Sequence, residues 1–174
     1  VTVGTQADDT DAINQYQVAY NLSADSWSGF FGQNNNWYSG SNNTTYYLQD
    51  NWVAATYTNS YTTLLSSWKQ IKQESEKTET PEIFALAQIL KISAWHKTLE
   101  SFGPIPYTHA GEPALVIPFD SEQVAFNAMF TDLTAAIDIL TVRAEQGATI
   151  VADYDAVYAG DTRKWVKYAN SLML

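Results

Sequence analysis

Cysteine is absent from the sequence and basic residues are scarce, and both shortages limit what the protein can be. Zero Cys among 174 residues excludes a disulfide scaffold and a metal site built on thiolates. Nine Lys and Arg residues against 19 Asp and Glu give a formal net charge of -10. Because nucleic acids and anionic lipid surfaces attract basic faces, we expect neither nucleic acid nor direct adsorption to lipid headgroups.

Long apolar runs are also lacking. No stretch approaches the roughly 18 to 20 apolar residues that a membrane-spanning helix needs. The N-terminus, Val1 to Gln6, has neither the basic nor the apolar segment of a signal peptide, so we expect that any signal is missing from this sequence. The charged fraction is only 16%, and Asn, Thr, Ser, Gln and aromatic residues take the place of charge.

Apolar residues recur at helical spacing over much of the chain. This pattern predicts an all-α fold of tetratricopeptide-like helical pairs, α-solenoid in character, with long irregular loops. We expect helices after Asp8–Asp11, over 46–72 and 80–102, from Asp120 and from Asp161. The expected buried faces are Ile13, Val18 and Leu22; Tyr57, Tyr61, Leu64, Leu65, Trp68 and Ile71; Ile83, Leu86, Ala87, Leu90 and Ala94; Met129, Phe130, Leu133, Ile137 and Leu140; and Trp165, Val166, Ala169 and Leu172.

Several local signals set the expected helix ends. Residues 74–79 are polar and predict a turn, and Thr80-Pro81-Glu82 predicts a helix start. The two prolines of Gly103–Tyr107 predict an extended segment, and Asp120 with Gln123 resembles a capping box. The last helix shows no stop signal at Leu174, so we expect the native chain to continue.

Residues 26–45 follow no helix or strand period and predict an ordered surface loop. Aromatic rings stack on the apolar faces of sugars, and side-chain amides bond to sugar hydroxyls. Asn34, Asn36, Trp37 and Tyr38 are therefore the candidate ligand-binding residues. A structural alternative is equally open: Phe30 and Phe31 would anchor the loop to the core, and Trp37 would pack against the helix carrying Tyr46, Tyr47 and Trp52.

The sequence predicts no catalytic residue, no metal site and no cofactor. His96 and His109 do not form a metal-binding pair, and we expect His96 to be packed or half-exposed. Nineteen acids always offer some pair of carboxylates, so they are no sign of a glycosidase. Asp8, Asp9 and Asp11 lack the register of a calcium loop. The glycosylation sequons at Asn21, Asn42 and Asn43 are interpreted as chance matches.

Three segments, taken together, resemble the SusD/RagB family of outer-membrane nutrient-binding lipoproteins. Ser101–Tyr107 (SFGPIPY) is similar to the family's turn after its second long helix, and Thr131–Ile137 (TDLTAAI) is similar to a family helix. Asp155–Leu172 (DAVYAGDTRKWVKYANSL) is the most specific match. We interpret these motifs as scaffold, with Trp165, Ala169 and Leu172 in the core and Asn170 bonded to a loop backbone.

The resemblance is closest over residues 80–174 and implies a function that the motifs alone do not. It implies a surface-exposed lipoprotein of the outer membrane, held by its lipid anchor only. Such a protein captures a glycan or a peptide for a SusC-like TonB-dependent transporter and is not an enzyme. The family's lipobox cysteine is absent and its members are much longer. We therefore expect residues 1–174 to be a single helical domain, the N-terminal part of a larger protein.

Two other function classes stay open at this point. A helical scaffold that contacts only other proteins would also explain the paired helices. A glycoside hydrolase is the third class, and sustained release of reducing sugar would distinguish it from a binding protein.

Overall fold

The computed structural model describes residues 17–174, and over that range it is helical with long irregular loops, as predicted. The chain divides between Asn59 and Ser60 into two compact units, which are described separately. The predicted helix start at Asp8–Asp11, and Ile13 with it, lie outside the described residues.

In the unit that ends at Asn59, the described residues 17–59 form two helical segments and a long loop between them. The π-helical segment η1 (Gln17–Asp25), which includes Val18 and Leu22, packs against α2 (Asp50–Asn59). The loop contains two short 3-10 turns, η2 (Trp37–Gly40) and η3 (Asn43–Thr45). The predicted helix start at residue 46 is wrong, because Tyr46 is left-handed (φ 57°) and ends η3. The helix begins at Asp50, whose carboxylate suits the positive end of the helix dipole.

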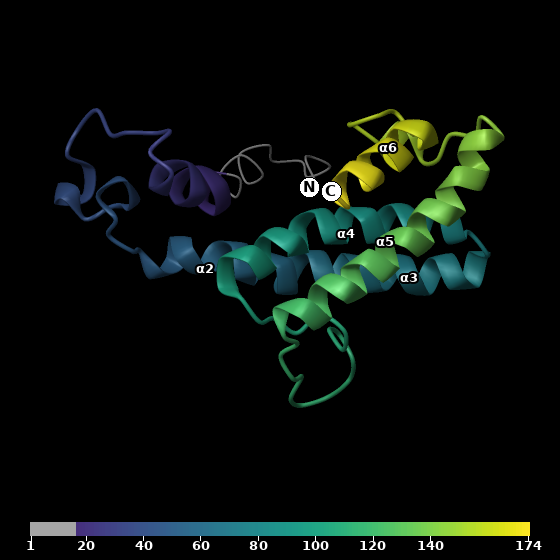
Figure 1. The fold of residues 1–174 in the computed structure, drawn as a ribbon, viewed down its shortest axis with the longest axis horizontal. Coiled ribbons are helices and arrows are strands. Elements are labelled where there is room, and N and C mark those ends of the chain that lie inside the picture. The colour runs from purple at the N-terminus through teal and green to yellow at the C-terminus, as the bar shows by residue number, and fades with distance from the viewer. Residues whose placement is uncertain (1–16) are drawn as a thin grey trace. The chain divides into compact units, whose positions relative to one another are not determined.

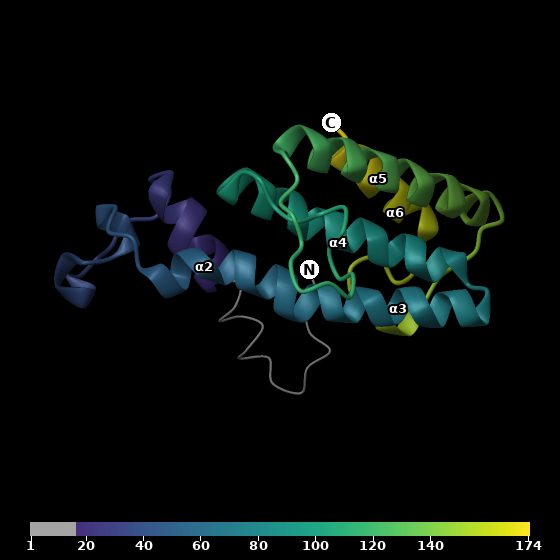
Figure 2. The same cartoon turned by 90° about the horizontal axis from the view of Figure 1, so that it is seen from below.

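The unit of residues 60–174 is a helical assembly. Its elements are η4 (Ser60–Leu64), α3 (Leu65–Thr78), α4 (Pro81–Phe102), α5 (Glu122–Glu145), η5 (Ala152–Tyr154) and α6 (Thr162–Leu172). Helix α4 lies between α3 and α5, and α6 packs against α5 (Figures 1 and 2). The loop between α4 and α5 extends away from the helices in Figure 1. The largest fully buried side chains are Trp95, Ile89, Ile92, Leu99, Ile105, Leu133 and Leu140.

Three local predictions are wrong in this unit. Residues 74–78 form the last turn of α3, stabilised by a Lys77–Glu74 ion pair of 2.6 Å, and only Glu79 (φ 54°) turns the chain. The cap of α5 is Ser121, whose hydroxyl accepts from the Val124 N–H, because the Asp120 carboxylate is used elsewhere. Phe130 is exposed. The buried stripe of α5 includes small residues and consists of Ala125, Met129, Leu133, Ala136, Leu140 and Ala144.

Helix α5 is more apolar than expected, because no stretch of the sequence was expected to approach the apolar length of a membrane-spanning helix. Among the described residues it is the helix that is long and apolar enough to span a bilayer by length and composition alone. Its buried stripe packs against α4 and α6, and Arg143 near its end pairs with Glu82 of α4 (3.1 Å). Packing covers only part of its apolar surface, because Val124, Phe130 and Val142 of the same helix are exposed.

A buried polar cluster joins α3, α4, α5 and the extended segment after α4. Trp68 Nε1 donates to Gln88 Oε1 (2.7 Å), and the Gln88 amide donates to Asp132 Oδ2 (2.5 Å). The Tyr107 hydroxyl donates to the same carboxylate oxygen (2.7 Å). The Lys91 ammonium, on a residue only 4% exposed, lies 4.1 Å from the ring centre of Trp68 and 4.4 Å from that of Tyr107.

Burial is the largest cause of the pKa shifts of Lys91 and Tyr107 in this cluster. It lowers the pKa of Lys91 from 10.5 to about 8, although Asp132 favours the charged form and Lys72 opposes it. Burial also raises the pKa of Tyr107 well above its ordinary value, and the Asp132 carboxylate acts in the same direction. The cluster therefore keeps a protonated phenol beside a carboxylate and a desolvated ammonium on aromatic faces.

The carboxylates of Asp155 and Asp120 lie outside the helices and hold two of the segments that resemble family motifs. Asp155 accepts from the backbone N–H groups of Val157, Tyr158 and Gly160 and from Trp165 Nε1 (2.7 Å). Asp120 accepts in the same way from the backbone N–H groups of Tyr107 and Thr108, at 2.9 and 2.7 Å.

Burial opposes ionisation of both carboxylates, but these hydrogen bonds outweigh it and hold each pKa below its usual value. The motif residues around Trp165 are thus scaffold. Asn170 is a correction to that interpretation, because its amide donates to Val166 O of its own helix instead of to a loop.

We expect Asp155→Asn to lower the free energy of unfolding by about 1–3 kcal/mol, because an amide cannot accept from all four donors and leaves at least one unpaired. Urea unfolding followed by circular dichroism measures the change. Asp153→Asn, at an exposed position of the same loop, is the matched control and should change stability little. Equal stability of the two variants would show that Asp155 does not organise the loop.

Lys91 predicts an uncommon pH dependence. Its folded pKa lies below its unfolded value, so the unfolded chain binds the extra proton between pH 8 and 10.5 and stability rises with pH there. The slope is up to about 1.4 kcal/mol per pH unit for one proton. Tyr107 acts in the opposite direction above about pH 10.

The difference in unfolding free energy between wild type and Lys91→Met, measured from pH 7.5 to 9.5, should therefore increase in favour of wild type. Lys97→Met, on the exposed side of α4, is the control. A difference that stays constant across this range would contradict the lowered pKa.

Candidate functional site

The candidate site is the loop of residues 26–49, and the Asn42 side chain is its centre. Asn42 is fully buried, and its Nδ2 donates to Gln33 Oε1 and to Trp37 O, both at 3.0 Å. Its Oδ1 accepts from the backbone N–H of Thr44 (3.0 Å) and from the Thr44 hydroxyl. One amide therefore ties Gln33, the start of η2 and η3 together.

Further hydrogen bonds to main-chain carbonyls hold the loop on either side of Asn42. The Thr45 hydroxyl donates to Gly40 O, and Gln49 Nε2 donates to Ser41 O (2.6 Å). The Tyr46 hydroxyl donates to Trp27 O (3.1 Å). These bonds explain why a segment without regular secondary structure has a defined conformation.

Three rings form the aromatic part of the site. Trp37 lies against Trp52 of α2, with ring centres 5.3 Å apart and planes at 31°. Tyr38 meets both rings edge-on, at 5.5 Å from each. Trp37 is half-buried, whereas Tyr38 is 64% exposed. The Trp37–Trp52 pair is thus the support, called here the tryptophan base, on which the solvent-exposed Tyr38 ring packs.

The backbone at Tyr38 is strained. Tyr38 and Ser39 are both left-handed (φ 51°), and Gly40 follows at φ 79°. A left-handed conformation costs about 1–2 kcal/mol for a residue with a side chain. Strain of this kind is concentrated at functional sites, where the surrounding contacts maintain it. Here the Asn42 bond to Trp37 O and the Ser41 N–H bond to Tyr38 O (2.9 Å) maintain it.

The structure places the four sequence-predicted residues on one loop with different exposures. Asn34 and Asn36 are exposed, as Tyr38 is, whereas Trp37 is half-buried against Trp52. Phe30 (85% exposed) and Phe31 (55% exposed) do not anchor the loop, contrary to the structural alternative. Trp37 does pack on α2 through Trp52, but Tyr46 and Tyr47 lie outside that helix and are exposed.

Sequence reasoning missed Asn42 and Gln33 as members of this site, whereas the structural alternative named Trp52 as a partner of Trp37. Asn42 was considered only as part of a glycosylation sequon, and both Asn42 and Asn43 are fully buried, so neither accepts a glycan in this conformation. The Asn-x-Thr-Thr pattern before Tyr46 is the available signal, because Asn42 and Thr45 form a capping box around η3.

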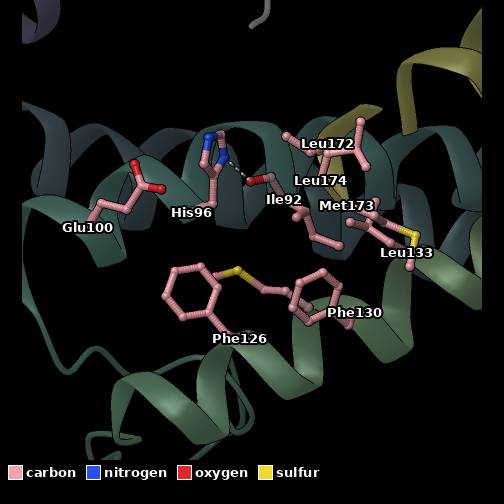
Figure 3. Close-up of a pocket in the computed structure, with 10 residues that line it drawn as sticks. Ile92, His96, Glu100, Phe126, Phe130, Leu133, Leu172, Met173 and Leu174 are labelled. Carbon is pink, nitrogen blue, oxygen red and sulfur yellow. Dashed lines mark hydrogen bonds between the residues drawn. The ribbon is translucent and has the colours of Figure 1, made fainter. Parts of the chain in front are cut away.

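A separate cavity of about 220 Å³ lies between α4, α5 and the end of α6 (Figure 3). Phe126, Phe130 and Leu133 of α5 line it, together with Leu172–Leu174. His96 and Glu100 are its polar groups, and the His96 Nδ1 already donates to Ile92 O (2.9 Å). The cavity is smaller than the roughly 300–1,000 Å³ of typical ligand sites. Its apolar lining also lacks the several amides and hydroxyls that a sugar requires.

Comparison with known proteins identifies relatives along almost the whole chain. The SusD-like family model, described as "Susd and RagB outer membrane lipoprotein", matches residues 2–174. Among curated protein sequences, none matches this chain.

Solved structures of SusD homologs are similar in fold and in sequence. A chitin-binding SusD homolog from Flavobacterium johnsoniae is 34% identical with a TM-score of 0.81, over 91% of this chain and 33% of that one. A SusD homolog from Bacteroides uniformis is 36% identical with a TM-score of 0.66, over 72% and 26%. A SusD homolog from Bacteroides ovatus is 27% identical with a TM-score of 0.78, over 91% and 31%. The chain thus spans about a third or less of the length of these relatives.

We expect Asn42→Ala to lower the unfolding free energy by about 1–3 kcal/mol, because Gln33, Thr44 and the Trp37 carbonyl each lose a partner. The near-ultraviolet circular dichroism of the Trp37–Trp52 pair should weaken at the same time. Asn35→Ala, at an exposed position of the same loop, is the control. A native aromatic spectrum in Asn42→Ala would show that the loop keeps its shape without this side chain.

Proposed function

The chain belongs to the SusD-like family of outer membrane lipoproteins, and from that membership we propose that it captures glycans at the cell surface for a TonB-dependent transporter. The capture step is assigned to the loop of residues 26–49. The transporter step, the surface exposure and the lipid anchor are proposed for the whole protein, because the chain spans about a third of the length of its solved relatives. The proposed role involves no cofactor and breaks no covalent bond.

The observation that carries the capture proposal is the exposed Tyr38 ring on its tryptophan base. A pyranose presents an apolar face of C–H groups, and a ring held rigidly at the surface stacks on it with little loss of conformational entropy. Asn34 and Asn36 carry exposed amides on the same loop, and each amide both donates and accepts. A stacking ring and amides are what recognition of a sugar requires.

The relatives support the ligand class. The Flavobacterium johnsoniae homolog, 34% identical over 91% of this chain, is described as chitin-binding. Oligosaccharides of N-acetylglucosamine are therefore the first probes to use, followed by other polysaccharides and by oligopeptides.

A second candidate function is a helical scaffold that contacts only proteins. The loop between α4 and α5 favours it, since Leu115 is fully exposed, Val116 is 81% exposed and Phe119 is 64% exposed. The two functions make different demands on Trp37. A glycan site needs this ring, whereas a scaffold that uses the α4–α5 loop does not.

We expect Tyr38→Ala and Trp37→Ala each to weaken glycan binding by about 1–3 kcal/mol, because the first removes the stacking ring and the second its support. Isothermal titration calorimetry with chito-oligosaccharides and a polysaccharide panel measures the affinity. Tyr154→Ala, which removes another exposed tyrosine outside the loop, is the matched control. An unchanged affinity in both loop variants would place the site elsewhere. A lack of binding to every glycan, with no transporter co-purifying, would exclude the capture function.

A further inference from the structure

Charge is distributed very unevenly along this chain. All nine Lys and Arg residues lie at position 69 or later, and so do both histidines and every glutamate. Within the described part of the first unit, residues 17–59, the only charged side chains are Asp25 and Asp50. The candidate loop 26–49 itself carries no charged residue, although 16% of the whole chain is charged.

The two carboxylates of this unit flank the loop in sequence. Asp25 ends η1, and its Oδ2 accepts from Asn21 Nδ2 (2.7 Å). Asp50 begins α2 and is exposed. Neither has a cationic partner in its unit, since residues 17–59 contain no Lys, Arg or His. The loop is therefore flanked in sequence by two negative charges, and residues 17–59 supply no positive charge to compensate them.

Sugars that carry carboxylate or sulfate groups are recognised through charge-assisted hydrogen bonds, for which proteins use Arg and Lys. Without a cation, an anionic sugar on this loop would lose hydration and gain no counter-charge. Stacking rings and amides, by contrast, bind a neutral sugar without any ionic contact. Like charges brought together across an interface reduce affinity further.

We propose that the ligand of the 26–49 loop is an uncharged glycan, and that the loop excludes uronic-acid-containing and sulfated glycans by its lack of cations. This inference rests on the proposed capture function and specifies its substrate class. Binding is then insensitive to ionic strength, because no ion pair contributes to it.

Matched polymers test the proposal with the chain of residues 1–174. Hydroxyethyl and carboxymethyl derivatives of cellulose, starch and chitin share three backbones and differ in charge. In affinity electrophoresis, we expect an uncharged derivative to bind and its carboxymethyl partner to bind at least about tenfold more weakly. Affinity for the uncharged polymer should change less than about twofold between 0.1 and 1 M NaCl, where the Debye length falls from about 10 Å to 3 Å.

A lysine placed in the loop separates the loop's own charge from the net charge of the chain. Asn34→Lys adds a cation at an exposed position of the loop, whereas Ser66→Lys adds the same charge at an exposed position of α3. We expect Asn34→Lys to reduce the discrimination against the carboxymethyl polymer to about threefold or less at 0.1 M NaCl, and Ser66→Lys to leave it unchanged.

Three outcomes would overturn the proposal, and they differ in what else they exclude. A carboxymethyl polymer that binds as tightly as its uncharged partner, and loses affinity in Tyr38→Ala, would refute the neutral-ligand inference and keep the capture function. Equal effects of Asn34→Lys and Ser66→Lys would show that discrimination comes from overall charge and not from the loop. An absence of binding to every polymer would exclude the capture function and this inference together.

Discussion

The helical unit of residues 60–174 depends on one buried charge, the ammonium of Lys91. Its nitrogen lies over the rings of Trp68 and Tyr107, and Asp132 on α5 supplies the opposite charge nearby. Gln88 and Tyr107 bond to the same carboxylate, so α3, α4, α5 and the extended segment all meet there. Apolar packing alone would allow these helices to slide along one another. The hydrogen bonds of Gln88 and Tyr107 to Asp132 favour the observed register, because another register would leave these groups unpaired in the interior.

The motifs that resemble the family serve this scaffold and not the ligand. In the Ser101–Tyr107 segment, Tyr107 enters the buried cluster and Asp120 fixes its backbone. In the Asp155–Leu172 segment, Asp155 binds the Trp165 indole and three backbone N–H groups, so the acidic residue and the tryptophan are parts of one contact. The motifs that resemble the family and the loop proposed to bind the ligand therefore lie in different units of the chain.

The sequence predicts the helices well because apolar periodicity and proline act locally. The face of Tyr57, Tyr61, Leu64, Leu65, Trp68 and Ile71 is half-buried at every position, as its spacing requires. The errors occur where a side chain has two possible partners. Asp120 has the composition of a helix cap, yet it binds Tyr107 and Thr108, and only the path of the chain decides between them. The sequence does not predict Lys91 in the core, because no periodic pattern shows that the rings of Trp68 and Tyr107 and the carboxylate of Asp132 lie near it.

At the candidate site, the role of Asn42 is likewise not predicted by periodicity. The way in which the loop is held also has an evolutionary consequence. The loop is held largely through main-chain carbonyls, those of Trp37, Gly40 and Ser41, and through buried amides, whereas the side chains of Asn34, Asn36 and Tyr38 face outward. Substitutions at Asn34 and Asn36 leave these supporting bonds intact, whereas Tyr38 also contacts the rings of Trp37 and Trp52. Under the proposed capture function, a lineage could change its nutrient preference at Asn34 and Asn36 without losing the bonds that hold the loop.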